Sequence, residues 1–413
     1  MPCYRTVSVL EVMPIASYSD TLVMDNGGHT LKVGFSSQSG PRTIPNCIMK
    51  AKSEKRRAFI GDQIDDCRDL SSLFYLLPFQ KGYLVNWDHQ KSVWDYVFGK
   101  NCFNICPEKL NLIFTEPYFN FSSIQEGLSE IFFEEYGFKS LLRTHAGDLS
   151  CFRNKLQFSG EKCCLVIDCG FSFTHVAPYV LGRRVREQVK RIDVGGKLLT
   201  NHLKEIISYR QLHVLDETHV MNGCKEDCCY VAQDWEAEVR LARNKGKENT
   251  IARDYVLPDF TTIRRGYMKS QEESTGKPAE GEQIIRMNNE RFMVPEILFR
   301  PSDIGISQMG LAESVVESVS GCSEAAQPWL YRNILLTGGC AQFPGLRDRL
   351  QQEVRRLAPG EMEVVVRETD NSVEFAWKGG ASLASDKEFK AMCVTKQEYM
   401  ETGFQACQER FYL

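Results

Sequence analysis

The hydrophobic pattern of the chain contains one arrangement twice. The apolar runs 22–27 and 165–170 each end in Asp and break at Gly, and apolar-rich runs follow them at 31–35 and 173–176. Apolar runs bounded by glycine are typical of strands joined by tight turns. The repeat therefore predicts two related half-domains that face each other, each with a strand–Asp–Gly–strand hairpin.

A third buried strand and three helices follow from the same pattern. The apolar run 334–337 predicts the strand. Apolar residues at helical spacing predict helices at about 122–136, 199–207 and 346–357. The first residues of the first helix, 122–126, resemble a capping box. Strands followed by helices indicate an α/β fold.

Composition narrows the class of protein only a little. The chain has 413 residues, 43% of them hydrophobic and 25% charged, which is enough for two or more globular domains. A net charge of −4 gives no global attraction to nucleic acid or membranes. We find neither a run long enough to span a bilayer nor a signal peptide in residues 1–20.

The 16 cysteines are interpreted as thiols of a reducing compartment. His213, His219, Cys224 and Cys228 could form a metal cluster, but their spacing does not match a zinc site, and scattered core thiols and surface histidines are the favoured interpretation. We therefore expect no metal held by protein groups alone.

One polar segment interrupts the α/β pattern. Residues Phe260–Gly281 predict a flexible insertion, and Arg264, Arg265 and Tyr267 within it are candidate partner-binding residues. A second basic stretch runs over 50–57. A solvated loop is the simpler interpretation of both stretches, and a binding patch is the alternative.

Further motifs occur in the order in which actin has them. They are Asp25-Asn26-Gly27, Asn86-Trp87-Asp88, Thr115-Glu116-Pro117, Asp168-x-Gly170 with Thr174-His175, Asn289-Glu290-Arg291-Phe292, Gly338-Gly339, Trp377-x-Gly379-Gly380 and Lys396-Gln397-Glu398-Tyr399. From about Thr21 to its end the chain therefore resembles the actin family. Phrases at 78–82 and 196–203, and the insertion after 257–259, resemble a nuclear, chromatin-remodelling subfamily of actin-related proteins more than conventional actin.

The resemblance implies the actin/Hsp70/hexokinase fold, an α/β fold with two lobes and four subdomains around a nucleotide cleft. Its implied divisions are a flexible extension 1–20, a first lobe of 21–156 with 376–413 and a small subdomain at about 47–82, and a second lobe of 157–375 with a small subdomain at about 196–287 that contains the insertion 260–281.

The resemblance also implies a set of nucleotide-binding residues. Asp25 and Asp168 would orient a hydrated Mg²⁺, which arrives only with the nucleotide, and Lys32 would meet the β-side phosphates. Lys225 and Glu226 would lie beside the adenosine. The remaining members of the implied set are Asn26, Gly27, Gly170, Gly338 and Gly339.

Four positions depart from the actin pattern. His29 replaces a glycine of the first phosphate loop, Phe171 replaces an Asp of the second, His145 stands for the Gln that positions the attacking water, and Val373 replaces a Lys near the adenine. Hydrolysis needs a positioned water and neutralised phosphate charge. We therefore expect a degenerate ATPase site that holds ATP or ADP as a structural ligand. A cleft that is empty and closed by Phe171 and His29 stays open as the alternative.

For function, the resemblance implies a non-catalytic subunit of a SWR/SRCAP-type chromatin-remodelling complex, which exchanges the Z-type variant histone into nucleosomes. The implied partners are the remodeller motor subunit, a small zinc-finger subunit and nucleosomal DNA. The resemblance implies a nuclear location and leaves a cytoplasmic one open, without membrane association. The alternatives are a nucleotide-dependent ATPase, which Phe171 and His29 disfavour, a filament-forming actin-like protein, which the insertion disfavours, and a sugar or acetate kinase on the same fold.

Overall fold

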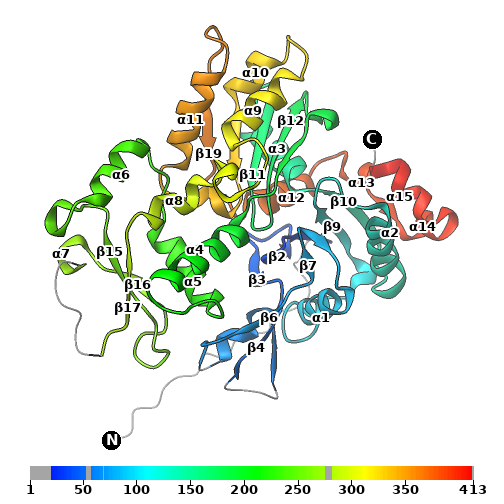
Figure 1. The fold of residues 1–413 in the computed structure, drawn as a ribbon. Helices are drawn as coiled ribbons and strands as arrows, with labels where there is room; N and C mark the ends of the chain where they lie inside the picture. Colours follow the sequence, from blue (N-terminus) through cyan, green and yellow to red (C-terminus); the bar gives the residue numbers. More distant parts are fainter. Residues whose placement is uncertain (1–19, 53–56, 68, 275–280, 412–413) are drawn as a thin grey trace, which may run out of the picture.

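The computed structural model describes residues 20–52, 57–67, 69–274 and 281–411. The predicted N-terminal extension, apart from Asp20, lies outside the described residues. The rest forms two lobes, one drawn in blue, cyan and red and the other in green, yellow and orange (Figure 1). Each lobe is built around its own central sheet.

The sheet of the first lobe has the strand order β20-β10-β9-β1-β2-β3. Strand β1 pairs antiparallel with β2 and parallel with β9, and β9 pairs parallel with β10. The strands are β1 (Thr21–Asn26), β2 (Thr30–Phe35), β3 (Arg42–Pro45), β9 (Asn111–Glu116), β10 (Ser140–His145) and β20 (Val394–Thr395).

The sheet of the second lobe repeats this plan. Its order is β13-β12-β11-β18-β19, and β11 again pairs antiparallel with the next strand in the chain and parallel with a later one. The predicted pair of hairpins and the third strand are therefore confirmed. The strands are β11 (Cys163–Cys169), β12 (Thr174–Val180), β13 (Arg183–Arg184), β14 (Lys190–Ile192), β18 (Ile334–Thr337) and β19 (Val366–Glu368).

Helices cover both sheets. Their bounds are α1 (Trp87–Phe98), α2 (Ser122–Glu130), α3 (Ala146–Gln157), α4 (Gly196–Arg210), α5 (Thr218–Cys228), α6 (Trp235–Arg243), α7 (Gln271–Ser274), α8 (Glu290–Glu296), α9 (Leu311–Ser320), α10 (Gln327–Arg332), α11 (Leu346–Leu357), α12 (Phe375–Leu383), α13 (Phe389–Met392), α14 (Lys396–Thr402) and α15 (Phe404–Phe411). In the part of the chain that the structure describes, no helix is long and apolar enough to cross a bilayer.

The three helices predicted from the sequence are confirmed as α2, α4 and α11. The predicted capping box of α2 is wrong. Its N-cap is Phe121, which makes no side-chain cap, and the Gln125 side chain donates instead to Glu116. The predicted helix also changes type, because residues Ile131–Glu135 continue it as a π-helix.

Helices α3 and α12 pack against each other where the two lobes meet (Figure 1). Their approach is so close that a Cβ at Gly379 would lie 2.1 Å from the carbonyl oxygen of Leu149. The Trp377 indole N–H donates to the carbonyl of Val23 in β1 at 3.1 Å. The tryptophan–glycine motif of the sequence thus fixes α12 to both α3 and the first hairpin.

Each lobe also carries a small sheet. Strands β4 (Ile48–Lys50), β5 (Ala58–Ile60) and β6 (Phe74–Leu76) extend from the first lobe around their own apolar cluster. Strands β7 (Phe79–Gln80) and β8 (Tyr83–Leu84) follow them. In the second lobe, β15 (Arg253–Val256) is the centre of a sheet with β16 (Tyr267–Met268) and β17 (Ile284–Met287).

The expected flexible insertion is wrong for residues 266–274. Strand β16 pairs with β15, and a Cβ at Gly266 would lie 2.5 Å from the carbonyl oxygen of Val256. The Ser274 hydroxyl is buried and accepts a hydrogen bond from the backbone N–H of Asp254 at 3.0 Å. A two-residue strand inside a polar segment leaves no hydrophobic period to detect, which is why the sequence pattern missed it.

Candidate functional site

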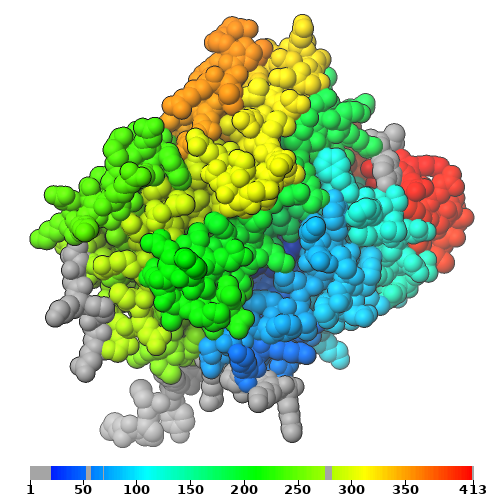
Figure 2. All heavy atoms as spheres, in the orientation of Figure 1, coloured from blue at the N-terminus to red at the C-terminus, as the bar shows by residue number. Residues whose placement is uncertain are grey.

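The two hairpin turns face each other across a cavity of about 440 Å³ between the lobes. In Figure 2 the dark-blue N-terminal segment is visible at the bottom of a hollow between green and light-blue surfaces. Strands β1 and β11 end here because glycines break their apolar runs, and the Asp next to the last residue of each strand lines the cavity. A volume of this size falls within the range of small-molecule sites.

The structure brings the predicted nucleotide-binding residues together around this one cavity. The lining includes Asp25, Asn26, Gly27, Lys32, Asp168, Gly170, Lys225, Glu226, Gly338 and Gly339. Of the four departures from the actin pattern, His29, Phe171 and Val373 also line it. His145 is not among the lining residues.

The two aspartates differ in their surroundings. Asp25 accepts a hydrogen bond from the Thr115 hydroxyl at 2.7 Å and pairs with Lys32 at 3.4 Å. Burial and the nearby Asp25 carboxylate raise the pKa of Asp168 to about 6, although Lys32 acts in the opposite direction. A hydrated cation between the two carboxylates would relieve this repulsion, and such oxygen ligands suit Mg²⁺.

The backbone beside Asp168 is shaped by glycine. Gly338 has a φ of +91°, a region that other residues avoid, and a Cβ there would lie 2.6 Å from Oδ1 of Asp168. Because Gly338 ends strand β18 next to β11, the third predicted strand delivers an open stretch of backbone to the cavity wall. Ligand atoms can approach such backbone closely.

Lys225 has a structural task of its own. Its buried ammonium donates to the carbonyl of Gly196 at 3.2 Å, to the Thr200 hydroxyl at 2.9 Å and to Asn222 at 2.9 Å. Two of these hydrogen bonds join α5 to α4, and the third stays within α5. The neighbouring Glu226 accepts from the same Asn222 side chain at 2.7 Å and is exposed on the cavity rim.

Two aromatic rings meet across the cavity. His29, from the first hairpin turn, stacks on Phe171, from the second, with ring centroids 4.6 Å apart and an interplanar angle of 24°. By its solvent-accessible surface, His29 is an exposed residue of the cavity lining. The protein packed around its ring, together with Lys225 and Lys32, lowers the pKa of His29 to about 4. The ring is therefore neutral at pH 7, and the turns are joined by an apolar contact.

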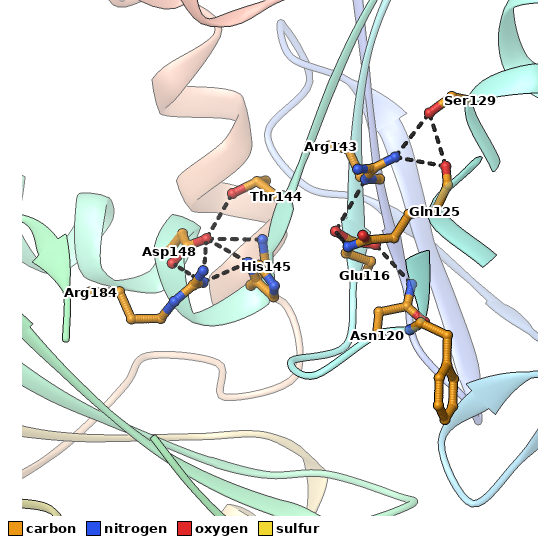
Figure 3. A network of polar contacts seen from close by, with 10 residues as sticks. Glu116, Asn120, Gln125, Ser129, Arg143, Thr144, His145, Asp148 and Arg184 are labelled. Carbon is orange, nitrogen blue, oxygen red and sulfur yellow. Dashed lines mark hydrogen bonds and ion pairs between the residues drawn. The ribbon is translucent and has the colours of Figure 1, made fainter. Parts of the chain in front are cut away.

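His145 belongs to a polar network behind the cavity (Figure 3). Its ring stacks on Tyr118 with centroids 4.7 Å apart and contacts both Asp148 at 2.9 Å and Arg184 at 2.6 Å. The Tyr179 hydroxyl donates to the same Asp148 at 2.8 Å. His145 is therefore not a lining residue, and its Nδ1 is engaged by Asp148 and Arg184.

A second network lies under the adjoining wall (Figure 3). Glu116, which lines the cavity, accepts from Arg143 at 3.1 Å, from Gln125 at 2.8 Å and from Asn120 at 2.8 Å. Arg143 and Glu116 are both buried, so the pair fixes α2 against β9 and β10. The Thr-Glu-Pro motif pointed to Glu116, but nothing in the sequence marks Arg143.

His175 is a lining residue to which the sequence analysis gave no role. It is buried between Tyr118 and Phe173, with ring centroids at 4.9 and 4.8 Å, and its Nε2 has no hydrogen-bond partner among the described residues. Burial and the nearby Arg191 lower its pKa to about 3. A neutral, unpaired ring nitrogen at the cavity wall is available to a ligand or a water molecule.

Direct contacts span the mouth of the cavity. They join the subdomain that carries the small sheet of the first lobe to the subdomain that carries the small sheet of the second. The backbone N–H and hydroxyl of Ser72 donate to Glu217 at 3.1 and 2.9 Å. The hydroxyl of Tyr75 lies 3.4 Å from Nδ1 of His219. Ser72 has a φ of +49°, an unfavourable conformation for serine that aims its N–H across the mouth. We call these contacts the mouth latch.

The candidate partner-binding residues lie outside the cavity. Arg265 pairs with Asp227 at 2.8 Å and Arg264 is exposed. Tyr267 is exposed on β16. Within the described residues no group of three or more His, Cys, Asp or Glu could hold a metal ion. His213 and His219 are exposed, and Cys224 and Cys228 are buried, as expected of surface histidines and core thiols.

The comparisons with known proteins fit this geometry. The family model described as actin matches residues 16–412. A relative named actin-related protein 6 from Drosophila melanogaster is 48% identical over 94% of this chain and 99% of its own length. One of the same name from Arabidopsis thaliana is 39% identical over 95% and 100%. One named actin-like protein ARP6 from Cryptococcus neoformans is 39% identical over 94% and 84%.

The chain therefore belongs to the actin family, and the expected actin-like α/β fold is confirmed. Within that family, the relatives reported above are named actin-related protein 6 or actin-like protein ARP6, which confirms the resemblance to actin-related proteins of that name.

Proposed function

We propose that this chain is a non-catalytic, actin-related subunit of a SWR/SRCAP-type remodelling complex in the nucleus, acting as a scaffold in the exchange of the Z-type variant histone. The names of its relatives support an actin-related subunit. The observation that carries the non-catalytic part is the His29–Phe171 stack, because it places two uncharged rings where phosphate transfer would need charge and water.

A nucleotide fits the cavity as a structural ligand. Asp25 and Asp168 would hold the water shell of Mg²⁺, Lys32 would face the phosphates, and the open backbone at Gly338 would meet the base and sugar. Bound ATP or ADP would supply charge and contacts to both lobes and would thereby favour the arrangement in which the two lobes close around the cavity. His145 offers no free general base to an attacking water, since its Nδ1 is held by Asp148 and Arg184.

Two measurements test the proposal. The first is co-purification of the chain with the motor subunit and the small zinc-finger subunit after co-expression, where a stable complex is expected. The second is steady-state phosphate release, which should equal that of an Asp25→Ala variant. Turnover that Asp25→Ala abolishes would identify a working ATPase, and failure to co-purify would remove the scaffold role.

A further inference from the structure

The two hairpin turns touch each other along one wall of the cavity. Each of the three residues that follow Gly170 contacts the first lobe. Phe171 stacks on His29, with ring centroids 4.6 Å apart. Ser172 lies against the backbone of the first turn, where a Cβ at Gly28 would be 2.9 Å from its Oγ. The turns therefore leave no gap between them at these two positions.

Phe173 continues this line of contacts. A Cβ at Gly82, which has a φ of +73°, would lie 1.8 Å from Cζ of Phe173, so the ring rests directly on the turn between β7 and β8. The guanidinium of Arg191 covers the same ring at 4.0 Å and donates to the Tyr83 hydroxyl at 2.6 Å. All the contacting residues line the cavity, and we call their contacts the turn seam: residues 28, 29 and 82 of the first lobe against 171–173 of the second.

The turn seam offers few hydrogen-bond donors to a phosphate. The rings of Phe171 and Phe173 have none. The backbone N–H of Gly27 donates to the carbonyl of Asp25 at 3.2 Å, and the backbone N–H of Gly170 donates to the carbonyl of Phe173 at 3.1 Å. Glycine N–H groups at such turns can bind oxyanions, but these two are already used inside their own hairpins.

The charges around the cavity also limit the length of a phosphate chain. The described lining carries the ammonium groups of Lys32 and Lys225 and the carboxylates of Asp25, Glu116, Asp168 and Glu226. Lys225 is engaged by its three hydrogen bonds, whereas Lys32 lies at the first turn, where a Cβ at Gly27 would be 3.3 Å from its Nζ. Lys32 and one Mg²⁺ suit a short chain, and each further phosphate adds negative charge that no other described ammonium group of the lining is free to meet.

We infer that the turn seam makes the cavity select a nucleoside diphosphate over a nucleoside triphosphate. The inference rests on the proposed function, in which a nucleotide is a structural ligand of this cavity. A terminal phosphate needs room and positive charge between the two turns, and the seam supplies contact between the lobes and aromatic rings instead. A triphosphate therefore binds only if the seam separates and its contacts are lost, whereas a diphosphate leaves the seam intact.

The test compares the dissociation constants of MgADP and of a non-hydrolysable ATP analogue with Mg²⁺, measured by isothermal titration calorimetry on the full chain. The unaltered chain should bind MgADP more tightly by about tenfold. The double variant His29→Gly with Phe171→Ala removes both stacked rings, so the analogue should bind more tightly and the two constants should become similar. The matched control, His213→Gly with Phe74→Ala, removes an exposed histidine and an exposed phenylalanine outside the cavity and should keep the original ratio.

Further arms keep the outcome decisive. Melting temperatures show whether the double variant is folded, and His29→Gly alone, which removes one exposed ring, should shift the ratio in the same direction. Equal constants for the two nucleotides in the unaltered chain would overturn the inference, as would a ratio that neither variant changes or a nucleoside monophosphate that binds as tightly as MgADP.

Co-purification with the remodeller subunits is scored separately from nucleotide binding. Assembly together with equal binding of the two nucleotides would refute only the selection of the diphosphate. Selection of the diphosphate without assembly would refute only the scaffold role. If no nucleotide binds, both the inference and the proposed structural ligand are overturned, and co-purification alone decides the scaffold role.

Discussion

At the scale of single residues, the chemistry of the cavity depends on two positions whose side chains carry no charge. Phe171 supplies a ring where actin has a carboxylate, and His29 beside it is neutral because its pKa falls to about 4. The Phe171→Asp variant should raise the pKa of His29, because a nearby anion favours the imidazolium. Titration of the histidine ring protons by NMR measures this. The control Phe74→Asp, on an exposed phenylalanine, should leave His29 unchanged.

His175 makes the stability of the chain depend on pH. Its folded-state pKa is about 3 against about 6.5 in an unfolded chain, so the unfolded state takes up the proton first as the pH falls. The stability contribution is complete above pH 6.5 and is lost below it, which amounts to about 2 kcal/mol between pH 8 and pH 5. Urea unfolding at each pH should show a shallower decline for His175→Gln. Parallel curves for the two proteins would contradict the assignment.

At the scale of elements, sequence analysis found the arrangement that repeats and missed the contacts that depend on the tertiary fold. The two hairpins were predictable because apolar runs ending in Asp and Gly show in the sequence. The capping box failed because Gln125 turns to the buried Glu116, a contact that depends on the tertiary fold. Arg143 and the mouth latch gave no signal, because their partners lie far away in the sequence. The sequence analysis compared His145 with the water-positioning Gln of actin, whereas in the structure its ring is held by the contact with Arg184.

Strand β16 should prove to be part of the second lobe's framework. The Gly266→Ala variant would place a methyl group 2.5 Å from the carbonyl of Val256 and 2.6 Å from the Tyr255 ring. We expect a loss of about 1–3 kcal/mol of unfolding free energy. The control Gly360→Ala has open space and should change little. If both variants unfold at the same urea concentration, the segment is a tolerated loop after all.

The mouth latch should control access to the cavity. Glu217→Ala removes the acceptor of both Ser72 hydrogen bonds, so the two small subdomains should separate more often. The readout is the rate at which maleimide labels Cys340, a buried thiol of the cavity wall, followed by peptide mass spectrometry. A several-fold increase is expected. The neighbouring, exposed Asp216→Ala serves as the control, and equal labelling rates would mean that the latch does not limit opening.

At the scale of the whole molecule, the network around Asp148 joins the two lobes. Asp148 lies on α3 of the first lobe, and Arg184 from β13 of the second donates to it at 3.0 and 3.1 Å. Arg184→Ala leaves the carboxylate with fewer donors in a partly buried site, which should cost about 2 kcal/mol. Arg183→Ala, on its exposed neighbour, removes the same charge and should cost far less.

Loss of the Arg184–Asp148 contact in Arg184→Ala should also weaken the coupling between the two lobes. Because the Arg184–Asp148 contact crosses from one lobe to the other, the effects of Arg184→Ala and Asp148→Asn should be non-additive in a double-mutant cycle. Urea unfolding followed by tryptophan fluorescence and by circular dichroism gives the four free energies. Coincident transitions in the unaltered chain should separate in Arg184→Ala if the lobes then unfold independently. Additive effects with coincident transitions would show that the Arg184–Asp148 contact does not couple the two lobes.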